Sequence, residues 1–510
     1  MAKMRKRTEA PATDILRALP PHGRLPIMIR PPLSLGLALL PLLLLLVFLG
    51  INVAVFGDSA IEGPNQIALL LAAALAALIG LYQGRRWPRL QEGMLNVIQV
   101  VITPILMLLL IGAMASTWMV SGIVPTIIIY GLKLADPAWF YAGAALACAI
   151  VSTAIGSSWT TAATIGVAMM ATGDGLGMSL PVTAGAVISG AYFGDKLSPL
   201  SDTTNLASGV CGVDLFHHVR YLSLTTVPSF LIALSLFIVL GLRHTADGQI
   251  AQAEEMIDAI QASVFVSGWL LLVPVLVVVM IVRKMPALPL MLLATFAGSA
   301  CALVFQPELV WQIGGSSDWI GLYKGTLTPI VGDTAITTGH PFTDNLLSTS
   351  GMAGMLNTIW LILCAVVFGG LMEASGCLER VVTALNSLIR GRTSLVATTG
   401  ATCGVLNLTA SEQYLTLLIA GRMYNDSYKA HNLGPRNLSR TLEDSGTVTS
   451  VLVPWNTCGA FHATVLSIGT LSYLPFCFFN LISPLMTVIY MRLNIAIDEV
   501  LTSQDRLVSR

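Results

Sequence analysis

Two segments of the chain place acidic, hydroxyl and amide side chains between apolar runs. The first, residues 190–207, reads GAYFGDKLSPLSDTTNLA. Pro199 has no backbone N–H and is expected to break a helix here, which frees carbonyl oxygens. Carboxylate, hydroxyl, amide and carbonyl oxygens suit a hard cation such as sodium. The candidate ion and proton ligands in this segment are Asp195, Ser198, Asp202, Thr203, Thr204 and Asn205.

The second segment, residues 442–461, repeats this chemistry in the sequence LEDSGTVTSVLVPWNTCGAF. Gly446 permits an unwound or left-handed backbone. Ionisable side chains inside a membrane are costly, so they indicate function. The candidate ligands in this segment are Glu443, Asp444, Ser445, Thr447 and Asn456.

Paired acidic segments of this kind predict exchange of sodium for protons. Burial disfavours the charged carboxylate, so a buried carboxyl group either holds a proton or loses it and binds sodium. If both need the same oxygens, exchange follows from competition. We expect Asp202 and Asp444 to be the shared sodium and proton sites, supported by Asp195 and Glu443. No cofactor is expected, because sodium and protons are the transported species.

The composition places these segments in a membrane. Of 510 residues, 55% are hydrophobic and 11% are charged, and the mean hydropathy is +0.77. A soluble domain carries about 25% charged residues, so this chain needs a lipid bilayer as its main partner. The net charge is zero, and the sequence has no long basic run. It therefore gives no indication of a nucleic-acid partner. The eight cysteines form no C-x-x-C pair, so we expect neither a disulfide framework nor a structural metal site.

The apolar runs predict an all-α polytopic protein with about 10–13 transmembrane helices. The long candidate spans are 33–55, 65–82, 97–117, 137–155, 221–241, 264–282, 286–305, 357–373, 394–409 and 475–491. Shorter apolar pieces between them are interrupted by Gly, Pro, Ser and Thr. Such broken segments occur at membrane depth where they line a cavity, and we expect the binding site there.

A weak internal repeat appears when the chain is displaced along itself by about 254 residues, as in transporters built from two inverted halves. The first copy follows a basic loop and the second follows an acidic stretch, which favours inverted topology. The predicted organisation is a mobile cytoplasmic tail at 1–32, a helical hairpin at 33–96, a first repeat at 97–241 containing 190–207, connecting helices and a loop at 242–356, a second repeat at 357–491 containing 442–461, and a C-terminal tail at 492–510.

Charge bias predicts the orientation. The N-terminal tail is basic, and Arg85, Arg86 and Arg89 follow the second predicted span. Positive residues favour the cytoplasmic side. We therefore expect a multi-pass protein of the bacterial cytoplasmic (inner) membrane with its N terminus in the cytoplasm. The sequence leaves the oligomeric state open, a homodimer included.

The two acidic segments resemble the signature segments of the NhaC family of sodium/proton antiporters, within the ion transporter superfamily. GSSWTTAATIG and SEQYLTLLIAGRMY are also similar to family segments, and the resemblance extends over about residues 65–490. It implies inverted repeats with re-entrant elements, sodium/proton exchange, and ion-binding roles for the candidates named above. Glu412 stands where an aspartate is expected in this family. Some relatives exchange malate, lactate or other organic anions, so the resemblance leaves the co-substrate open.

Further residues are weaker candidates. Glu373 is read either as a proton-path residue or as a helix-end charge at the membrane interface. Glu412, in the counterpart of the Ser157–Trp159 segment, is a candidate proton-path residue. Lys196 is expected to neutralise a carboxylate or to bind substrate anions. A Gly- and Thr-rich stretch lines the pathway or, as we favour, forms an external loop; its polar members are Asp333, His340, Asp344 and Asn345.

Four rival functions share some of these features. A sodium-coupled proton/organic-anion exchanger or an amino-acid transporter would use the same fold and ion sites, and an organic solute would then change the ion flux. An intramembrane aspartyl protease uses G-x-G-D, but Asp195 follows Tyr-Phe-Gly and lacks the first glycine. A channel is less consistent with broken helices in repeated halves. We therefore predict a transporter and not an enzyme.

Overall fold

A computed structural model describes residues 33–134, 136–243, 249–283, 285–339, 343–344 and 347–499. The predicted tail at 1–32 lies outside the described residues, as do His340 and Asn345. Helices dominate the described chain, as predicted, and the only sheet in this part is a two-stranded hairpin of β1 (Thr334–Ala335) and β2 (Ser348–Thr349).

The N-terminal half runs from a helical hairpin into a series of broken helices. Its elements are α1 (Leu35–Phe56), α2 (Pro64–Tyr82), α3 (Trp87–Val120), α4 (Ile123–Leu134), α5 (Pro137–Ile155), α6 (Ser158–Thr161), the π-helical turn η3 (Ala162–Gly166), α7 (Val167–Gly175), α8 (Leu180–Leu197), α9 (Asp202–Cys211) and α10 (Leu215–Leu242).

The C-terminal half follows a set of connecting helices. These are α11 (Gln249–Ser263), α12 (Leu272–Val282), α13 (Ala287–Phe305), α14 (Pro307–Gly314) and α15 (Trp319–Val331). The remaining elements are α17 (Leu356–Ser375), α18 (Cys377–Asn386), α19 (Arg392–Thr409), α20 (Gln413–Ala430), α21 (Pro435–Leu442), the π-helical turn η6 (Glu443–Thr447), α22 (Val448–Ser450), α23 (Thr457–Val465), α24 (Thr470–Tyr473) and α25 (Phe478–Arg492).

The helices identify a multi-pass membrane protein. Within the described residues, seven helices are long and apolar enough to span a bilayer, and two bent pairs bring the number to nine if each pair is one span. The bent pairs are Glu255–Ser263 with Gly268–Met280, at 88°, and Thr470–Phe476 with Phe478–Arg492, at 55°. The predicted total of about 10–13 spans includes more polar helices such as α19 and stays a prediction.

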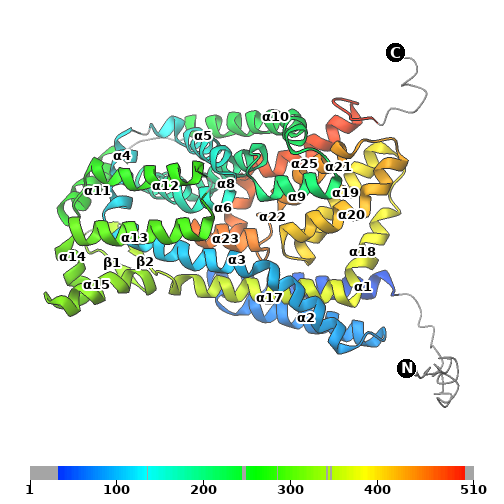
Figure 1. Cartoon of the computed structure of the whole chain (residues 1–510), viewed down its shortest axis with the longest axis horizontal. Helices are drawn as coiled ribbons and strands as arrows, with labels where there is room; N and C mark the ends of the chain where they lie inside the picture. The colour runs from blue at the N-terminus through cyan, green and yellow to red at the C-terminus, as the bar shows by residue number, and fades with distance from the viewer. Residues whose placement is uncertain are drawn as a thin grey trace, which may run out of the picture.

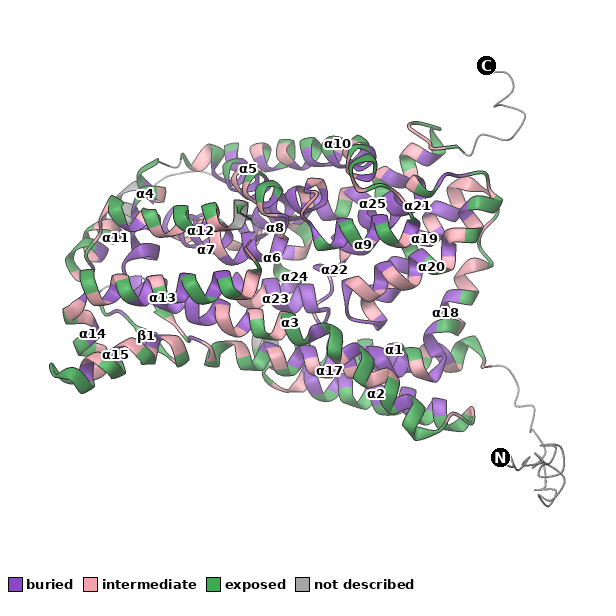
Figure 2. Cartoon of the chain, viewed as in Figure 1, coloured by how far each residue is buried: buried purple, intermediate pink, exposed green. Residues whose placement is uncertain are grey.

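The broken elements lie between two sets of long helices. Figure 1 shows α1, α2, α3 and α17 along one side, α5 and α10 along the other, and α6, α22 and α23 between them. Burial is concentrated on the middle elements (Figure 2). Large apolar side chains such as Val47, Ile150 and Leu231 are exposed on the outer helices, which suits contact with lipid.

Both predicted ligand segments contain a helix break. In the first, α8 ends at Leu197 and α9 starts at Asp202, so the chain stops being helical around Pro199 as predicted. In the second, the break lies at 451–456 and includes Pro454. Gly446 is not unwound, because it sits inside the π-helical turn η6 and has no positive φ.

The order of elements around these breaks recurs along the chain. Two further breaks use a left-handed residue followed by a helix-capping side chain: Gly156 (φ 74°) precedes the N-cap Ser157, and Ser411 (φ 59°) precedes the N-cap Glu412. Ser201 caps α9 and Asn456 caps α23. Within each pair the numbers differ by 255, close to the predicted displacement. The inverted orientation of the two halves stays a prediction.

Close packing of α5 on α8 holds the first ligand segment in place. Gly190 and Gly194 face the backbone of α5, and a Cβ on Gly190 would collide with the carbonyl oxygen of Ala145. Small residues at such contacts let two helix backbones approach within a membrane. The position of Asp195 therefore depends on the glycines five residues and one residue before it.

We predict that Gly190→Ala lowers the free energy of unfolding by about 1–3 kcal/mol, because backbone atoms cannot give way to the added methyl group. Thermal unfolding of the purified chain in detergent measures the effect. Gly143→Ala on α5 is the matched control, because a Cβ there meets no atom within 4 Å. Equal melting temperatures for the two variants would contradict the close packing.

Candidate functional site

Asp195 lies in the last turn of α8 and is buried. Its Oδ2 accepts a hydrogen bond from the backbone N–H of Ser158 at 3.1 Å and another from the Ser158 hydroxyl at 2.7 Å. Ser158 is the first residue of α6. One carboxylate therefore joins the end of α8 to the start of the broken helix before it.

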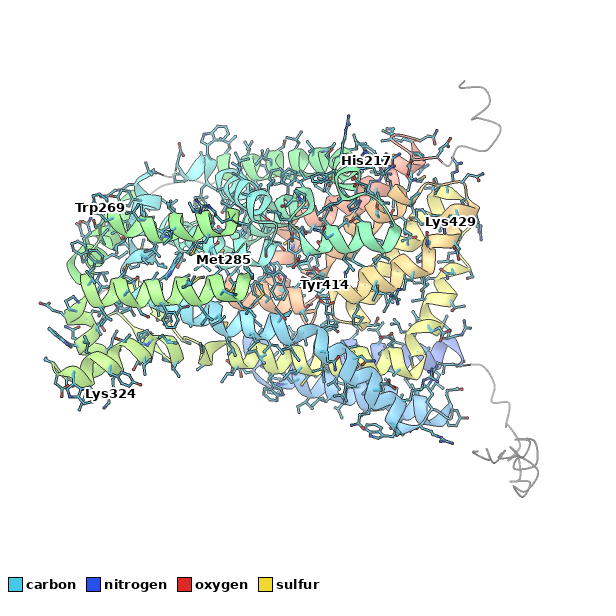
Figure 3. The ribbon with its side chains drawn as sticks, viewed as in Figure 1. His217, Trp269, Met285, Lys324, Tyr414 and Lys429 are labelled. Atoms are coloured by element: carbon cyan, nitrogen blue, oxygen red, sulfur yellow. The ribbon has the colours of Figure 1, made fainter. Side chains whose placement is uncertain are left out.

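A cavity of about 650 Å³ opens at this junction, and we call it the acidic cavity. Asp195 and Asp202 both line it, with Ser201 and Thr203 beside them. Asp202 is the first residue of α9 and is exposed. The second half contributes Gln413 and Tyr414, and the connecting helices contribute Met285–Leu290; Figure 3 labels Tyr414 and Met285 near the middle of the molecule.

The charge of this cavity has one sign. Among the described residues that line it there are two aspartates and no Lys, Arg or His. Its other polar side chains carry hydroxyls, one indole, one amide and one phenol, from Thr103, Ser157, Ser158, Trp159, Thr160, Ser201, Thr203, Gln413 and Tyr414. Such a lining attracts cations and repels anions.

The other candidates of the first segment hold the break together. The Asn205 side-chain amide donates to the carbonyl oxygens of Ser201 at 2.7 Å and Pro199 at 3.1 Å. The Ser198 hydroxyl accepts from the Leu200 N–H at 3.3 Å. The Thr204 hydroxyl donates to the Lys196 carbonyl at 3.4 Å. These contacts satisfy backbone groups that the missing helical turn leaves unpaired.

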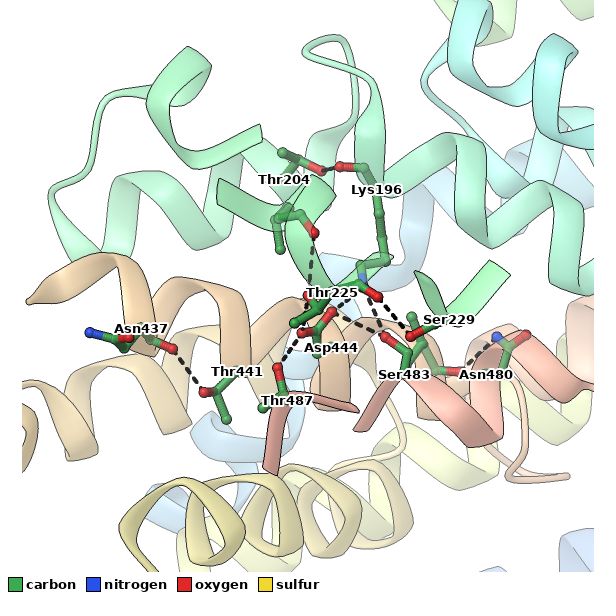
Figure 4. Close-up of polar contacts among 12 residues, drawn as sticks. Lys196, Thr204, Thr225, Ser229, Asn437, Thr441, Asp444, Asn480, Ser483 and Thr487 are labelled. Carbon is green, nitrogen blue, oxygen red and sulfur yellow. Dashed lines mark hydrogen bonds and ion pairs between the residues drawn. The ribbon is translucent and has the colours of Figure 1, made fainter. Parts of the chain in front are cut away.

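Asp444 lies in the π-helical turn η6 and is fully buried. Figure 4 shows its carboxylate at the centre of a polar cluster. Lys196 forms an ion pair with Oδ1, and the Ser483 hydroxyl donates to the same oxygen at 3.1 Å. The hydroxyls of Thr225, at 2.8 Å, and of Thr487 donate to Oδ2. Both oxygens are thus fully engaged by elements α8, α10 and α25.

Glu443, the preceding residue, has the opposite surroundings. Its side chain is fully buried, and neither carboxyl oxygen has a hydrogen-bond partner among the described residues. The Thr447 hydroxyl lies beside it without reaching hydrogen-bond geometry. Ser445 is buried on the same turn. A carboxylate without donors or a cation is very costly to bury, whereas the protonated acid is not charged.

Asn456 caps the short helix after the second break. Its Oδ1 accepts from the Cys458 N–H at 3.0 Å, and its Nδ2 donates to the Asn407 carbonyl at 3.1 Å. Asn407 in turn donates to the Gly446 carbonyl at 2.8 Å. The amides of Asn407 and Asn456 therefore stabilise the broken backbone in this conformation.

The sequence is similar to known proteins over most of its length. The sequence profile of the Na+/H+ antiporter family matches residues 190–495. The chain is 37% identical over 454 residues to the Na(+)/H(+) antiporter NhaC of Alkalihalophilus pseudofirmus. This match covers 89% of the chain and 96% of NhaC.

The chain belongs to the Na+/H+ antiporter family. It is also 36% identical over 464 residues to the arginine/ornithine antiporter ArcD of Halobacterium salinarum, covering 89% of this chain and 91% of ArcD. It is 34% identical over 428 residues to the malate-2H(+)/Na(+)-lactate antiporter of Bacillus subtilis, and the match covers 84% of this chain and 89% of that protein. The resemblance to NhaC is confirmed, and the chain is a transporter and not an enzyme.

Asp202 and Asp444, which we expected to be the shared sodium and proton sites, lie in different surroundings. Asp202 lines the acidic cavity, whereas Asp444 does not line it and is ion-paired with Lys196. The expected neutralising role of Lys196 thus matches its geometry. Asp195 and Asp202 share one cavity, while Glu443 and Asp444 form a second, enclosed pair of acids.

The weaker candidates fall in different places. Glu412 is buried and caps α20 by accepting from the Leu415 N–H at 3.0 Å. Glu373 is exposed near the end of α17 and lines neither the acidic cavity nor a second cavity of about 870 Å³. Asp333 lines that second cavity. Asp344 accepts from the Thr338 N–H at 2.6 Å within the loop between the strands.

Sequence reasoning missed three hydroxyl residues around Asp444: Thr225, Ser483 and Thr487. Each lies in a long, mainly apolar helix. A local signal existed, because both helices carry an internal proline, Pro228 and Pro484, close to these hydroxyls. Hydroxyl residues beside a proline in a membrane helix help to satisfy the freed backbone and mark positions worth inspecting.

We predict that Asn456→Ala destabilises the antiporter by about 2 kcal/mol, because it removes a helix cap and leaves the buried Asn407 carbonyl without its donor. Asn456→Ser is the matched variant: it restores the cap acceptor and is expected to recover about half of the loss. Thermal unfolding in detergent checks both values. A melting temperature that Asn456→Ala leaves unchanged would show that the cap is dispensable.

Proposed function

We propose that the antiporter exchanges sodium for protons and that sodium binds in the acidic cavity. The observation that carries this proposal is the presence of two carboxylates, Asp195 and Asp202, on a cavity without a basic side chain among its described lining residues. Carboxylate and hydroxyl oxygens are hard ligands of the type that sodium takes. The hydroxyls of Ser201 and Thr203 supply such oxygens beside the two acids.

Competition at these carboxylates would couple the two ions. When Asp202 is protonated, it loses the negative charge that attracts sodium, and sodium binding requires that the proton leave. Lowering the pH therefore weakens sodium binding, by up to about tenfold per pH unit for each competing proton. Movement of the broken elements against the long helices would then expose the site to each side in turn.

A second proton site is the buried Glu443. Neither of its oxygens has a hydrogen-bond partner in the part of the chain that the structure describes, so the neutral acid is the form that this environment tolerates. Its ionised form would become tolerable only if a cation moved next to it. We therefore assign Glu443 a proton-carrying role and not a sodium-binding role in this conformation.

The alternative is exchange of an organic solute, since relatives are named for malate, lactate, arginine and ornithine. A volume of about 650 Å³ exceeds the needs of a bare sodium ion. The acidic lining suits a cationic amine better than malate or lactate, whose carboxylates it would repel.

We place the protein in the bacterial cytoplasmic membrane, with the N terminus inside, from the positions of Arg85, Arg86 and Arg89.

Everted vesicles that lack native antiporters test the proposal. Respiration sets the proton gradient, an acridine dye reports it, and sodium is added first, followed by malate, lactate, arginine and ornithine. Dequenching by sodium alone supports sodium/proton exchange. A response only after an organic solute is added would replace the proposal by solute exchange.

We predict that Asp202→Asn lowers sodium-dependent dequenching at least tenfold, because an amide holds neither a proton nor a full negative charge. Asp214→Asn is the control, because Asp214 is an exposed N-cap of α10 outside the cavity and asparagine is an equally good cap. Immunoblotting of the vesicles checks that both variants reach the membrane. Full exchange in Asp202→Asn would remove this residue from the mechanism.

A further inference from the structure

The second cavity, of about 870 Å³, is separate from the acidic cavity. Both cavities follow α3: residues between 100 and 107 line the acidic cavity, and residues between 111 and 119 line the second one. The broken segment after α5 divides in the same way, with Thr160 on the acidic cavity and Thr164 on the second. Among the described residues none lines both, so the proposed sodium site does not account for the second cavity.

The wall of the second cavity is mainly apolar and adaptable. The side chain of Trp118 lines it, together with four methionines, Met114, Met119, Met170 and Met355. Methionine fits ligands of irregular shape because its chain is flexible and polarizable. Tryptophan is the aromatic residue that attracts cations best. Sites for small molecules combine such walls with a few polar groups in volumes of about 300–1,000 Å³, and the second cavity falls in this range.

Two carboxylates give this wall a negative charge. Asp174, near the end of α7, is half-buried, and Asp333, which precedes β1, is exposed. The described lining contains no Lys, Arg or His, and neither aspartate forms an ion pair with a described residue. The other polar side chains of the lining carry hydroxyls, from Thr164, Thr334, Ser348, Thr349, Ser350, Thr464 and Ser467. This lining attracts a cation and repels an anion or the phosphate of a lipid.

The wall that the β1–β2 hairpin forms is held by close contacts. The hydroxyls of Ser116, Thr334 and Thr349 lie 2.6–3.2 Å from one another, which fixes the hairpin to α3. A Cβ on Gly112 would collide with the carbonyl oxygen of Gly351, so the backbones of α3 and of the loop after β2 are in direct contact. The cavity is thus framed by packed elements, and a preformed site of this kind costs a ligand little rearrangement.

We propose that the second cavity is a binding site for an organic cation with an apolar, aromatic body. The carboxylates of Asp174 and Asp333 attract the positive charge, and Trp118 and the four methionines remove the apolar body from water. A bare sodium ion gains nothing from the apolar wall, because it requires oxygen ligands. This site is distinct from the acidic cavity and does not depend on sodium/proton exchange.

The test measures the binding of radiolabelled tetraphenylphosphonium to the purified full-length chain in detergent, without sodium and without a proton gradient. Excess unlabelled probe defines the amount that dissolves in the micelles. Asp174→Asn and Asp333→Asn should each raise the Kd about three- to tenfold, because each removes one attracting charge. Asp426→Asn is the matched control and should keep the wild-type Kd, because Asp426 is exposed on α20, at the opposite end of the molecule from β1 and β2 (Figure 1).

Triphenylphosphine oxide, a neutral molecule with three of the same rings, separates the role of charge from that of the apolar wall. It should displace the probe from the wild type at least about tenfold less effectively than unlabelled tetraphenylphosphonium does. Equal displacement would overturn the inference, because the aspartates would then play no part. The inference also fails if wild-type binding is not saturable, and this result is independent of the sodium measurements in vesicles.

The acidic cavity is the other place in which the probe could bind. A loss of binding in Asp202→Asn that is absent in Asp174→Asn and Asp333→Asn would place the probe there and overturn the inference. Should these last two variants fail to fold, Ser350→Trp adds bulk at an exposed position of the second cavity instead. Saturable binding should then be lost, and an unchanged Kd would exclude the second cavity as the site.

Discussion

A helix that stops inside a membrane leaves amide and carbonyl groups with no water to bind. This constraint governs the broken segments of the antiporter. Side chains of Ser157, Ser201, Glu412 and Asn456 satisfy the first N–H groups of four helices. Trp455 donates to the Leu408 carbonyl at 2.8 Å, and Asn480 donates to the Val448 carbonyl at 2.9 Å. Only because these groups are satisfied can acidic residues stand at the breaks.

The two acidic clusters use their surroundings in opposite ways. Around Asp195 and Asp202 the structure leaves a cavity in which a cation can be bound by side-chain oxygens. Around Asp444 the space is filled by Lys196 and three hydroxyl groups. A single protein thus holds an open acidic site and a neutralised one, linked by the consecutive residues Asp195 and Lys196.

The sequence was sufficient where the signal is local. Pro199 and the polar residues around it predict a break, and the break is present between α8 and α9. Basic loops and apolar runs likewise predict a polytopic helical protein. The partners of Asp444 were not predictable in this way, because Thr225, Ser483 and Thr487 are far from it in sequence and look like ordinary members of apolar helices. Gly446 misled for a related reason: its flexibility permits several backbones, and the packing of neighbouring helices selects a π-helical turn.

The recurrence of helix caps at a spacing of 255 residues has a consequence for the side chains beside the breaks. At that spacing Asp195 corresponds to Ser450 and Lys196 to Val451, so the two halves place caps at equivalent positions while the neighbouring side chains differ in charge. The positions of the caps and the identity of the side chains beside them are therefore separate features of this sequence. A side chain beside a break thus differs between the two halves without loss of the cap at that break. The recurrent caps give both halves the same way of ending a helix inside the membrane, with different chemistry placed beside each break.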